Sequence, residues 1–218
     1  SCIDFIEALK PIPYRITFIA VVAIAAGFLS WTYTSAKFSP ALKFDRNYGE
    51  FVKAKTNKYA VKGNVLGSKA KDAVVLEIYS DYKCPICFSA NIMVHKLAKD
   101  FKNLRVEHRN LPLDQECNKN LTAPFHIGSC VNARYALAAK KQGKFWEVDS
   151  LLFESKASNE ENIVKALNKS GFGLDMDQLK RDANSKEIEN EIQNDISEAA
   201  SHNLNGTPVL NINGVYHM

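Results

Sequence analysis

The sequence predicts an α/β fold that contains a parallel strand–helix–strand unit and a helical insertion, and that follows one transmembrane helix. Three observations lead to this prediction. Apolar, β-branched residues at 73–79 and an alternating pattern at 104–111 indicate two strands separated by a helical pattern. Residues of helical character at about 123–203 separate these strands from a last strand at 207–212. At the start of the chain, residues 16–36 form a long uncharged run.

The composition is that of a globular protein. The chain has 218 residues, of which 46% are hydrophobic and 24% charged, so it can form one sizeable domain plus accessory segments. The formal net charge of +4 comes from scattered lysines, without a basic run or interleaved aromatic residues. This pattern argues against nucleic acid as a partner.

The uncharged run at 16–36 is long enough to cross a bilayer as one helix. Trp31 and Tyr33 lie where an interfacial aromatic belt is expected, and Lys10 and Arg15 precede the run. Positive residues before the helix place that side in the cytoplasm. A cleaved signal peptide is the alternative. However, the run is long for the hydrophobic region of a signal peptide, and residues 1–15 before it contain acidic residues, so we favour a membrane anchor.

The segments on either side of this helix are less informative. The chain opens on Ser1-Cys2 and not on Met, so we interpret it as a fragment of a longer protein. Residues 1–15 are then a cytoplasmic-side segment, which could be the tail of a missing domain. Residues 37–72 are polar and rich in lysine, and we expect a tether that ends in a loop at 63–69.

The next part of the chain predicts the strand–helix–strand unit. Apolar residues recur at helical spacing from Cys87 to Phe101, so a helix of about fifteen residues joins the two strands. A right-handed crossover with parallel strands is the natural arrangement. Asn213-Gly214 then predicts a hairpin turn after the last strand. Five further helices are expected, at 131–142, 145–153, 160–170, 176–184 and 187–202.

Cys84-Pro85-Ile86-Cys87 lies between the first strand and its helix. The first cysteine therefore begins the helix, where unpaired N–H groups and the helix dipole favour a thiolate. The thiolate is the reactive form in thiol–disulfide exchange, and proline suits the first helical turn. Half a zinc site or a structural pair are the alternatives. The absence of a second Cys-x-x-Cys, together with the strand–helix context, favours a redox pair.

Gly206-Thr207-Pro208 enters the last strand. A proline at the first residue of a strand has an ordinary explanation, because that position donates no bond to the sheet. Beside a Cys-x-x-Cys it predicts a cis proline that packs against the two cysteines. The backbone of Thr207 would then be free to pair with an extended substrate.

Three segments together resemble the disulfide-bond protein A (DsbA)-like family: residues 63–87, residues 142–147 and residues 206–214. The resemblance covers about 63–218. It implies a thioredoxin-like fold with a helical subdomain inserted before the cis-proline strand, so we expect one such domain at 73–218. The resemblance further implies that the chain stops before the closing helix of that fold.

The resemblance also implies roles for individual residues. Cys84 is the attacking cysteine, Cys87 is its partner, and Thr207 and Pro208 bind substrate. The dipeptide between the cysteines is Pro-Ile, whereas strongly oxidising members have Pro-His. The redox direction is therefore open. A structural cysteine pair beside a redox pair points to an oxidising compartment such as a bacterial periplasm, and this favours an oxidant.

Cys117 and Cys130 form a second candidate pair. Two independent buried thiols are one alternative, and a relay to the first pair is another. We favour a structural disulfide that joins the loop after the second strand to the first inserted helix. This extra pair resembles the thioredoxin-like domain fused to bacterial vitamin K epoxide reductase homologues, in which a transmembrane helix precedes the domain. Cys2 would then be a remnant of the lost part.

Other titratable residues carry weaker predictions. His95, His108 and His126 are expected to pack or to face solvent. Asp81 and Glu77 lie near the cysteines, where they could change a cysteine pKa by their charge, but a structural role is the more common one.

These observations predict a membrane-anchored thiol–disulfide oxidoreductase, without a cofactor or metal, that acts on exported proteins. We expect it in the bacterial inner membrane with its catalytic domain on the periplasmic side. Its partners would be thiol-containing or disulfide-bonded proteins and a quinone-linked membrane redox partner. The alternatives are an in-cis partner domain of a vitamin K epoxide reductase homologue, a non-catalytic peptide-binding module, and a copper(I) chaperone.

Overall fold

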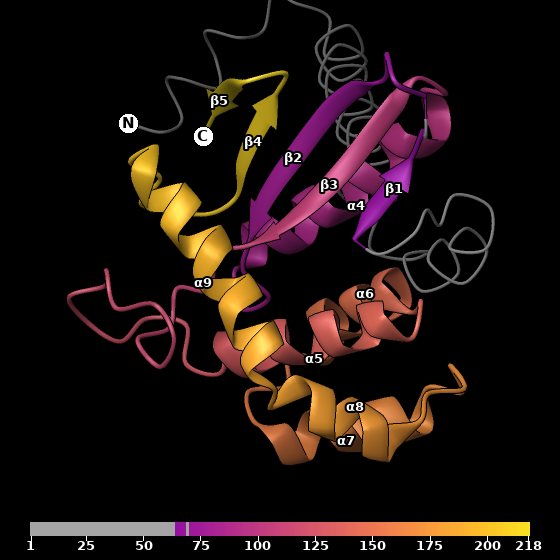
Figure 1. Ribbon diagram of the computed structural model, residues 1–218, viewed down its shortest axis with the longest axis vertical. Helices are drawn as coiled ribbons and strands as arrows, with labels where there is room; N and C mark the ends of the chain where they lie inside the picture. The colour runs from indigo at the N-terminus through magenta and orange to yellow at the C-terminus, as the bar shows by residue number, and fades with distance from the viewer. Residues whose placement is uncertain (1–63, 69) are drawn as a thin grey trace, which may run out of the picture. The chain divides into compact units, whose positions relative to one another are not determined.

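The computed structural model describes residues 64–68 and 70–218 (Figure 1). The predicted cytoplasmic-side segment (1–15), the predicted transmembrane helix (16–36) and the predicted tether as far as residue 63 lie outside the described residues. Within the described part, no helix combines the length and the apolar character needed to cross a bilayer.

The described residues form a mixed sheet in the order β1-β3-β2-β4-β5 (Figure 1). The central strands β2 (Val74–Ser80) and β3 (Leu104–Asn110) are parallel, as expected for a crossover through a helix. On one side β4 (Val209–Ile212) runs antiparallel to β2 and continues through a tight turn into β5 (Val215–His217). On the other side β1 (Val65–Gly67) runs antiparallel to β3.

Strand β1 corrects one prediction, because a loop was expected at 63–69. The strand has three residues, too few to show periodicity, and its pairing with β3 defines it. Gly67 adopts φ +93°, and a Cβ there would lie 2.4 Å from the carbonyl oxygen of Leu104, so only glycine fits. Trp146 also donates a hydrogen bond to the carbonyl of Val65 at 3.2 Å. The folded domain therefore begins before residue 73.

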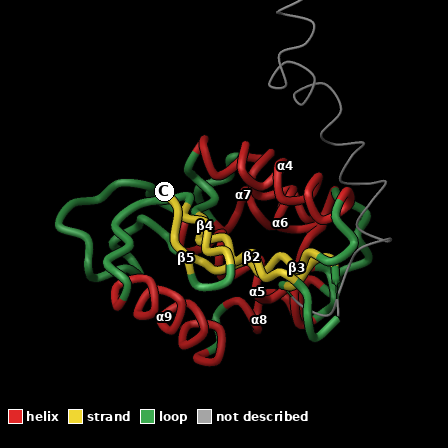
Figure 2. Tube along the Cα trace, turned by 90° about the horizontal axis from the view of Figure 1, so that it is seen from above, coloured by secondary structure: helices red, strands yellow, loops and turns green. Residues whose placement is uncertain are grey.

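The helices begin and end within about two residues of their predicted bounds, and they lie on both sides of the sheet. Figure 2 shows α4 (Pro85–Asp100) on one side and α9 (Lys186–Ser201) on the other. Between them in sequence come α5 (Ser129–Lys141), α6 (Phe145–Ser155), α7 (Glu160–Lys169) and α8 (Met176–Ala183). These four helices and α9 form the predicted helical insertion between β3 and β4.

Side-chain caps explain where the later helices begin. The residue before each of α7, α8 and α9 is a short polar one whose side chain accepts a backbone N–H three residues on. Such a cap satisfies a donor that the helix itself leaves unpaired. The three caps are Asn159, Asp175 and Ser185.

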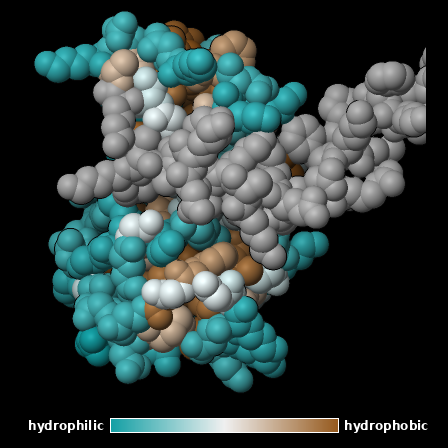
Figure 3. All heavy atoms as spheres, turned by 90° about the vertical axis from the view of Figure 1, so that its right-hand side faces the viewer, coloured by the Kyte–Doolittle hydropathy of each residue, from teal (hydrophilic) through white to brown (hydrophobic). Residues whose placement is uncertain are grey.

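The hydrophobic core continues from the sheet into the helical insertion. Ile78 and Val106 of the central strands are at most 1% exposed, as are Phe145 and Trp146 of α6. Both aromatic residues were predicted to be core residues, and this is confirmed. On the face shown in Figure 3, hydrophilic side chains cover most of the described surface, and hydrophobic ones gather in patches between them. The thioredoxin-like α/β fold is thus confirmed for the described residues.

Candidate dithiol site

Cys84 occupies the N-cap position of α4, where the chain leaves β2. Its backbone is extended, with φ −81° and ψ 118°, and its carbonyl accepts the N–H of Phe88 at 3.2 Å. Pro85 takes the first helical position, where its missing N–H costs no bond. The positive end of the helix dipole and the first free N–H groups therefore lie beside the Cys84 sulfur.

Cys87 lies one turn further on and is buried behind Cys84. The two side chains are free thiols, with residue exposures of 7% for Cys84 and 0% for Cys87. Burial, with a smaller contribution from the charge of Cys84, raises the pKa of Cys87 to about 12. Cys87 therefore keeps its proton at neutral pH when the pair is reduced.

Three groups oppose that rise in the pKa of Cys87. The hydroxyls of Ser80 and Thr207 and the backbone N–H of Asp81 face its sulfur and lower the pKa. Among the described residues, neither hydroxyl oxygen has another hydrogen-bond partner. Both hydroxyls can therefore donate to the Cys87 sulfur at the moment when it carries negative charge.

The Thr207-Pro208 loop meets the dithiol, although it lies far away in the sequence. The peptide bond between Thr207 and Pro208 is cis. The Cys84 thiol lies 3.5 Å from the carbonyl oxygen of Thr207, a contact across 123 positions. The structure thus brings four of the predicted site residues together, with Thr207 in contact with Cys84 and with Cys87.

The Asp81 side chain connects the turn before Cys84 to the loop at 111–128 through hydrogen bonds and a contact with a histidine. Its side chain is fully buried, and its two carboxylate oxygens accept the N–H groups of Lys83 and Leu113, each at 2.6 Å. The Nδ1 atom of His126 lies 3.2 Å from the first of these oxygens. We call residues 111–128 the disulfide loop, because Cys117 lies in it. Sequence reasoning placed Asp81 near the cysteines but did not find these partners.

Tyr82 and Lys83 tie the same turn to the helical insertion. The Tyr82 hydroxyl donates to Asp149 of α6 at 3.0 Å. The Lys83 ammonium donates to the carbonyl of Lys156 at 2.6 Å and to the hydroxyl of Ser158 at 2.7 Å. Neither residue was singled out from the sequence, where the only available signal was their position next to Cys84.

A buried polar cluster lies where the insertion meets the sheet. Asp149 has an inaccessible side chain, and burial raises its pKa to about 7, although hydrogen bonds from Asn91 and Tyr82 lower it. Burial also lowers the pKa of His108 to about 3 and that of His95 to about 4. The 3.6 Å contact between His108 and Asp149 therefore involves a neutral imidazole, so we do not treat it as an ion pair. The two histidines pack in the interior, one of the two expected alternatives.

Glu77 has a structural role within the sheet. Arg109 on the neighbouring strand donates two hydrogen bonds to one of its oxygens, at 3.0 and 2.8 Å, and Asn211 donates to the other at 2.6 Å. Arg109 also lies 3.6 Å from Asp195 of α9. These contacts join β2, β3, β4 and α9.

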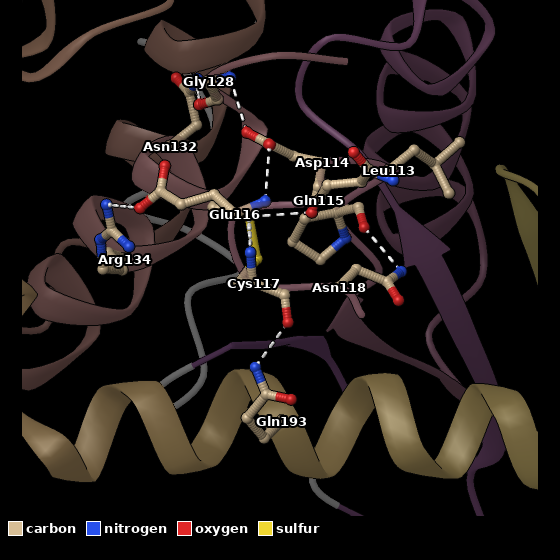
Figure 4. The surroundings of a disulfide bond; sticks show 12 residues. Leu113, Asp114, Gln115, Glu116, Cys117, Asn118, Gly128, Asn132, Arg134 and Gln193 are labelled. Carbon is tan, nitrogen blue, oxygen red and sulfur yellow. Dashed lines mark hydrogen bonds and ion pairs between the residues drawn. A yellow bond between two sulfur atoms is a disulfide. The ribbon is translucent and has the colours of Figure 1, made fainter. Parts of the chain in front are cut away.

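Cys117 and Cys130 form a disulfide with a Cα–Cα distance of 5.9 Å. Figure 4 shows the Asp114 carboxylate between Gly128 and Glu116, whose N–H groups it accepts at 2.7 and 3.0 Å. The disulfide joins the disulfide loop to α5, and the loop also reaches α9, because the Gln193 side chain donates to the carbonyl of Cys117 at 2.8 Å.

The fold and the paired thiols define this chain as a thioredoxin-like protein. A family model described as "DSBA-like thioredoxin domain" matches residues 75–218. The chain belongs to this family, which confirms the resemblance drawn from the sequence.

Solved structures support the same assignment. A thioredoxin-like oxidoreductase from Silicibacter pomeroyi superposes with a TM-score of 0.59 at 28% identity, covering 71% of this chain and 82% of that one. The thiol-disulfide exchange protein α-DsbA2 from Wolbachia pipientis has a TM-score of 0.59 at 20% identity, covering 78% and 88%. BdbD from Bacillus subtilis has a TM-score of 0.57 at 20% identity, covering 72% and 84%. The last two likenesses show the fold alone.

Curated relatives are longer proteins. The Na⁺/H⁺ antiporter NhaA 1 of Salinispora arenicola is 29% identical over 160 residues, and NhaA 3 of Salinispora tropica is 27% identical over 157 residues. Each match covers 72% of this chain and only 22% of the antiporter. The chain thus spans about a fifth of the length of these relatives.

Proposed function

We propose that this chain is a protein thiol–disulfide oxidoreductase whose reactive pair is Cys84 and Cys87. One observation carries the proposal: a cysteine at a helix N-terminus faces the Thr207 carbonyl at a cis proline, and a fully buried cysteine lies behind it. Cys84 is then the sulfur that substrates reach, because Pro85 and Ile86 beside it are exposed and Cys87 is not.

In the oxidising direction, the cycle starts from a Cys84–Cys87 disulfide. A substrate thiolate attacks the Cys84 sulfur, which forms a mixed disulfide and breaks the bond to Cys87. Cys87 leaves as a thiolate, accepts hydrogen bonds from Ser80 and Thr207, and then takes up a proton, as its raised pKa requires.

The second step releases the product. A second substrate thiolate attacks the substrate sulfur of the mixed disulfide, and Cys84 leaves as a thiolate at the start of α4. The substrate has lost two electrons to the enzyme pair, Cys87 holds one proton, and the other substrate proton goes to solvent. In the reducing direction, Cys84 attacks a substrate disulfide and Cys87 resolves the mixed disulfide. Oxidation is the favoured direction, because the Cys117–Cys130 disulfide points to an oxidising compartment.

The proposed location is the periplasmic side of the bacterial inner membrane, with residues 16–36 as the anchor and exported proteins as substrates. Support comes from the apolar run in the sequence and from curated relatives that are antiporters several times longer than this chain. A quinone-linked membrane partner would regenerate the disulfide. As an alternative, the chain serves such a partner in cis, as the thioredoxin-like part of a vitamin K epoxide reductase homologue.

The test is oxidation of a reduced dithiol peptide by the oxidised full chain in detergent. Cys84→Ser should abolish turnover. Cys87→Ser cannot form the Cys84–Cys87 disulfide, so it should not oxidise the reduced peptide. With a disulfide-bonded peptide, Cys84 of this variant should form a mixed disulfide that accumulates, because the resolving thiol is absent. The double variant C117S/C130S is the matched control and should retain activity. Full activity of Cys84→Ser would overturn the assignment of Cys84 as the reacting sulfur, and no oxidation of the peptide by the wild-type chain would favour a non-catalytic peptide-binding module.

A further inference from the structure

Asp81 contacts both cysteines of the dithiol through its backbone. Its carbonyl accepts the N–H of Cys84 at 3.1 Å, and its own N–H faces the sulfur of Cys87. Asp81 is 1% exposed, so its position depends on the groups that hold its side chain. A displacement of Asp81 would therefore change the hydrogen-bonding environment of both cysteines.

The disulfide loop supplies two of the three groups around the Asp81 carboxylate. Leu113 donates its N–H to one oxygen, and His126 brings its imidazole to the other. These two residues are tied to each other, because the His126 N–H donates to the Leu113 carbonyl at 2.8 Å. The ring of Phe125 stacks on the imidazole, with ring centroids 4.2 Å apart. The His126 side chain is therefore held in place, and it is only 16% exposed.

The charge of this pair matters to the dithiol. An ionised carboxylate beside two thiols opposes formation of a thiolate, and an imidazolium beside that carboxylate offsets its charge. Within the described residues, His126 is the only side chain able to carry positive charge within 4.0 Å of the Asp81 carboxylate. The ammonium of Lys83 is hydrogen-bonded elsewhere, to Lys156 and Ser158.

We propose that His126 is a positioning residue for the dithiol: it holds the Asp81 carboxylate and offsets its charge, and thereby shifts the thiol–disulfide equilibrium of Cys84 and Cys87 toward the reduced pair. This inference rests on the proposed function. It assigns to the disulfide loop a part in the chemistry, although the loop contributes no reacting atom.

The experiment measures an equilibrium constant for the full chain in detergent. In the reaction, the protein disulfide and two molecules of reduced glutathione give the protein dithiol and glutathione disulfide. His126→Gln removes the charge and keeps a polar side chain, and His202→Gln, at an exposed histidine on the far end of α9, is the matched control. At pH 6, His126→Gln should shift the equilibrium about tenfold toward the disulfide, or ~30 mV, whereas His202→Gln should not.

A second variant separates charge from packing. Asp81→Asn removes the carboxylate charge and keeps an amide oxygen as an acceptor, so it should shift the equilibrium toward the dithiol. In that background, His126→Gln should have no further effect at pH 6. An equilibrium that His126→Gln leaves unchanged, or an unchanged effect of His126→Gln in the Asp81→Asn background, would overturn the inference. If the wild-type chain exchanges with glutathione and the variants have the same equilibrium constant, this inference is wrong but the proposed function stands. If the wild type does not exchange with glutathione, the proposed function is wrong.

Discussion

The buried carboxyl of Asp149 allows a quantitative test of how the helical insertion is joined to the dithiol turn. Asp149 on α6 accepts hydrogen bonds from Tyr82, two residues before Cys84, and from Asn91 on α4. Burial raises its pKa from 3.8 to about 7, so the carboxyl is protonated in the folded protein at mildly acidic pH. The perturbation is Asp149→Asn, which resembles the protonated acid: its oxygen can accept from Asn91 and its amide can donate to the Tyr82 oxygen.

The sign follows from proton binding. The folded protein holds this proton more tightly than the unfolded chain, so the contribution of Asp149 to the stability of the wild type falls as pH rises from about 4 to about 7. The difference between 3.8 and about 7 corresponds to a loss on the order of 4 kcal/mol by pH 8. The asparagine variant has no such loss.

The two buried histidines act in the opposite direction. The pKa values of His95 and His108 are lowered to about 4 and about 3, so their contribution to stability rises with pH from about 4 to 6.5. Both proteins contain these histidines, so the difference between the two pH profiles isolates Asp149.

The assay is urea unfolding of the full chain in detergent between pH 4.5 and 8, with Asp175→Asn as the control. Asp175 is an exposed helix cap, and asparagine caps a helix equally well. The stability of Asp149→Asn relative to the wild type should increase with pH, by about 3 kcal/mol between pH 5 and pH 8, because this range covers only two of the pH units between 3.8 and about 7. Parallel profiles for Asp149→Asn and the wild type would refute the reasoning.

Three further variants test the contacts around the site. Tyr82→Phe removes a donor that lowers the pKa of the buried carboxyl on α6, so the pH midpoint of the stability profile should rise and stability should fall by about 1–2 kcal/mol at pH 8. The double variant C117S/C130S opens the bond between Cys117 and Cys130 and should lower the free energy of unfolding by about 3 kcal/mol; a change below 1 kcal/mol would contradict this. Gly128→Ala places a Cβ 2.2 Å from the carbonyl oxygen of Ser158 at φ +91°, and should cost about 2–4 kcal/mol in urea unfolding, whereas an unchanged midpoint would show that the loop adapts freely.

Local patterns were enough to predict the central elements. The strands β2 and β3, the crossover helix α4 and the helices of the insertion all carry their own periodicity or caps, so their bounds could be placed closely. The positions of Cys84 and Pro208 at element boundaries were also visible, because prolines and helix starts leave local signals.

Contacts between distant segments could not be predicted in the same way. Strand β1 is defined by its pairing with β3, and its three residues are too few to show a periodicity that would predict this pairing. The partners of Asp81, Tyr82 and Lys83 lie 32 to 75 positions along the chain, in segments whose packing the sequence does not reveal. The direction of the redox reaction stays a prediction for the same reason, since it depends on the charges that the folded chain assembles around two sulfur atoms.

The most direct test of the central claim is alkylation of the reduced full chain at pH 7 by a small neutral reagent, with the modified sites mapped by mass spectrometry. Cys84 is 7% exposed and lies at the start of α4, and it should react at least about tenfold faster than Cys87, which is 0% exposed and whose pKa of about 12 keeps it protonated. Equal labelling of the two cysteines in the folded protein would contradict the division of roles between them.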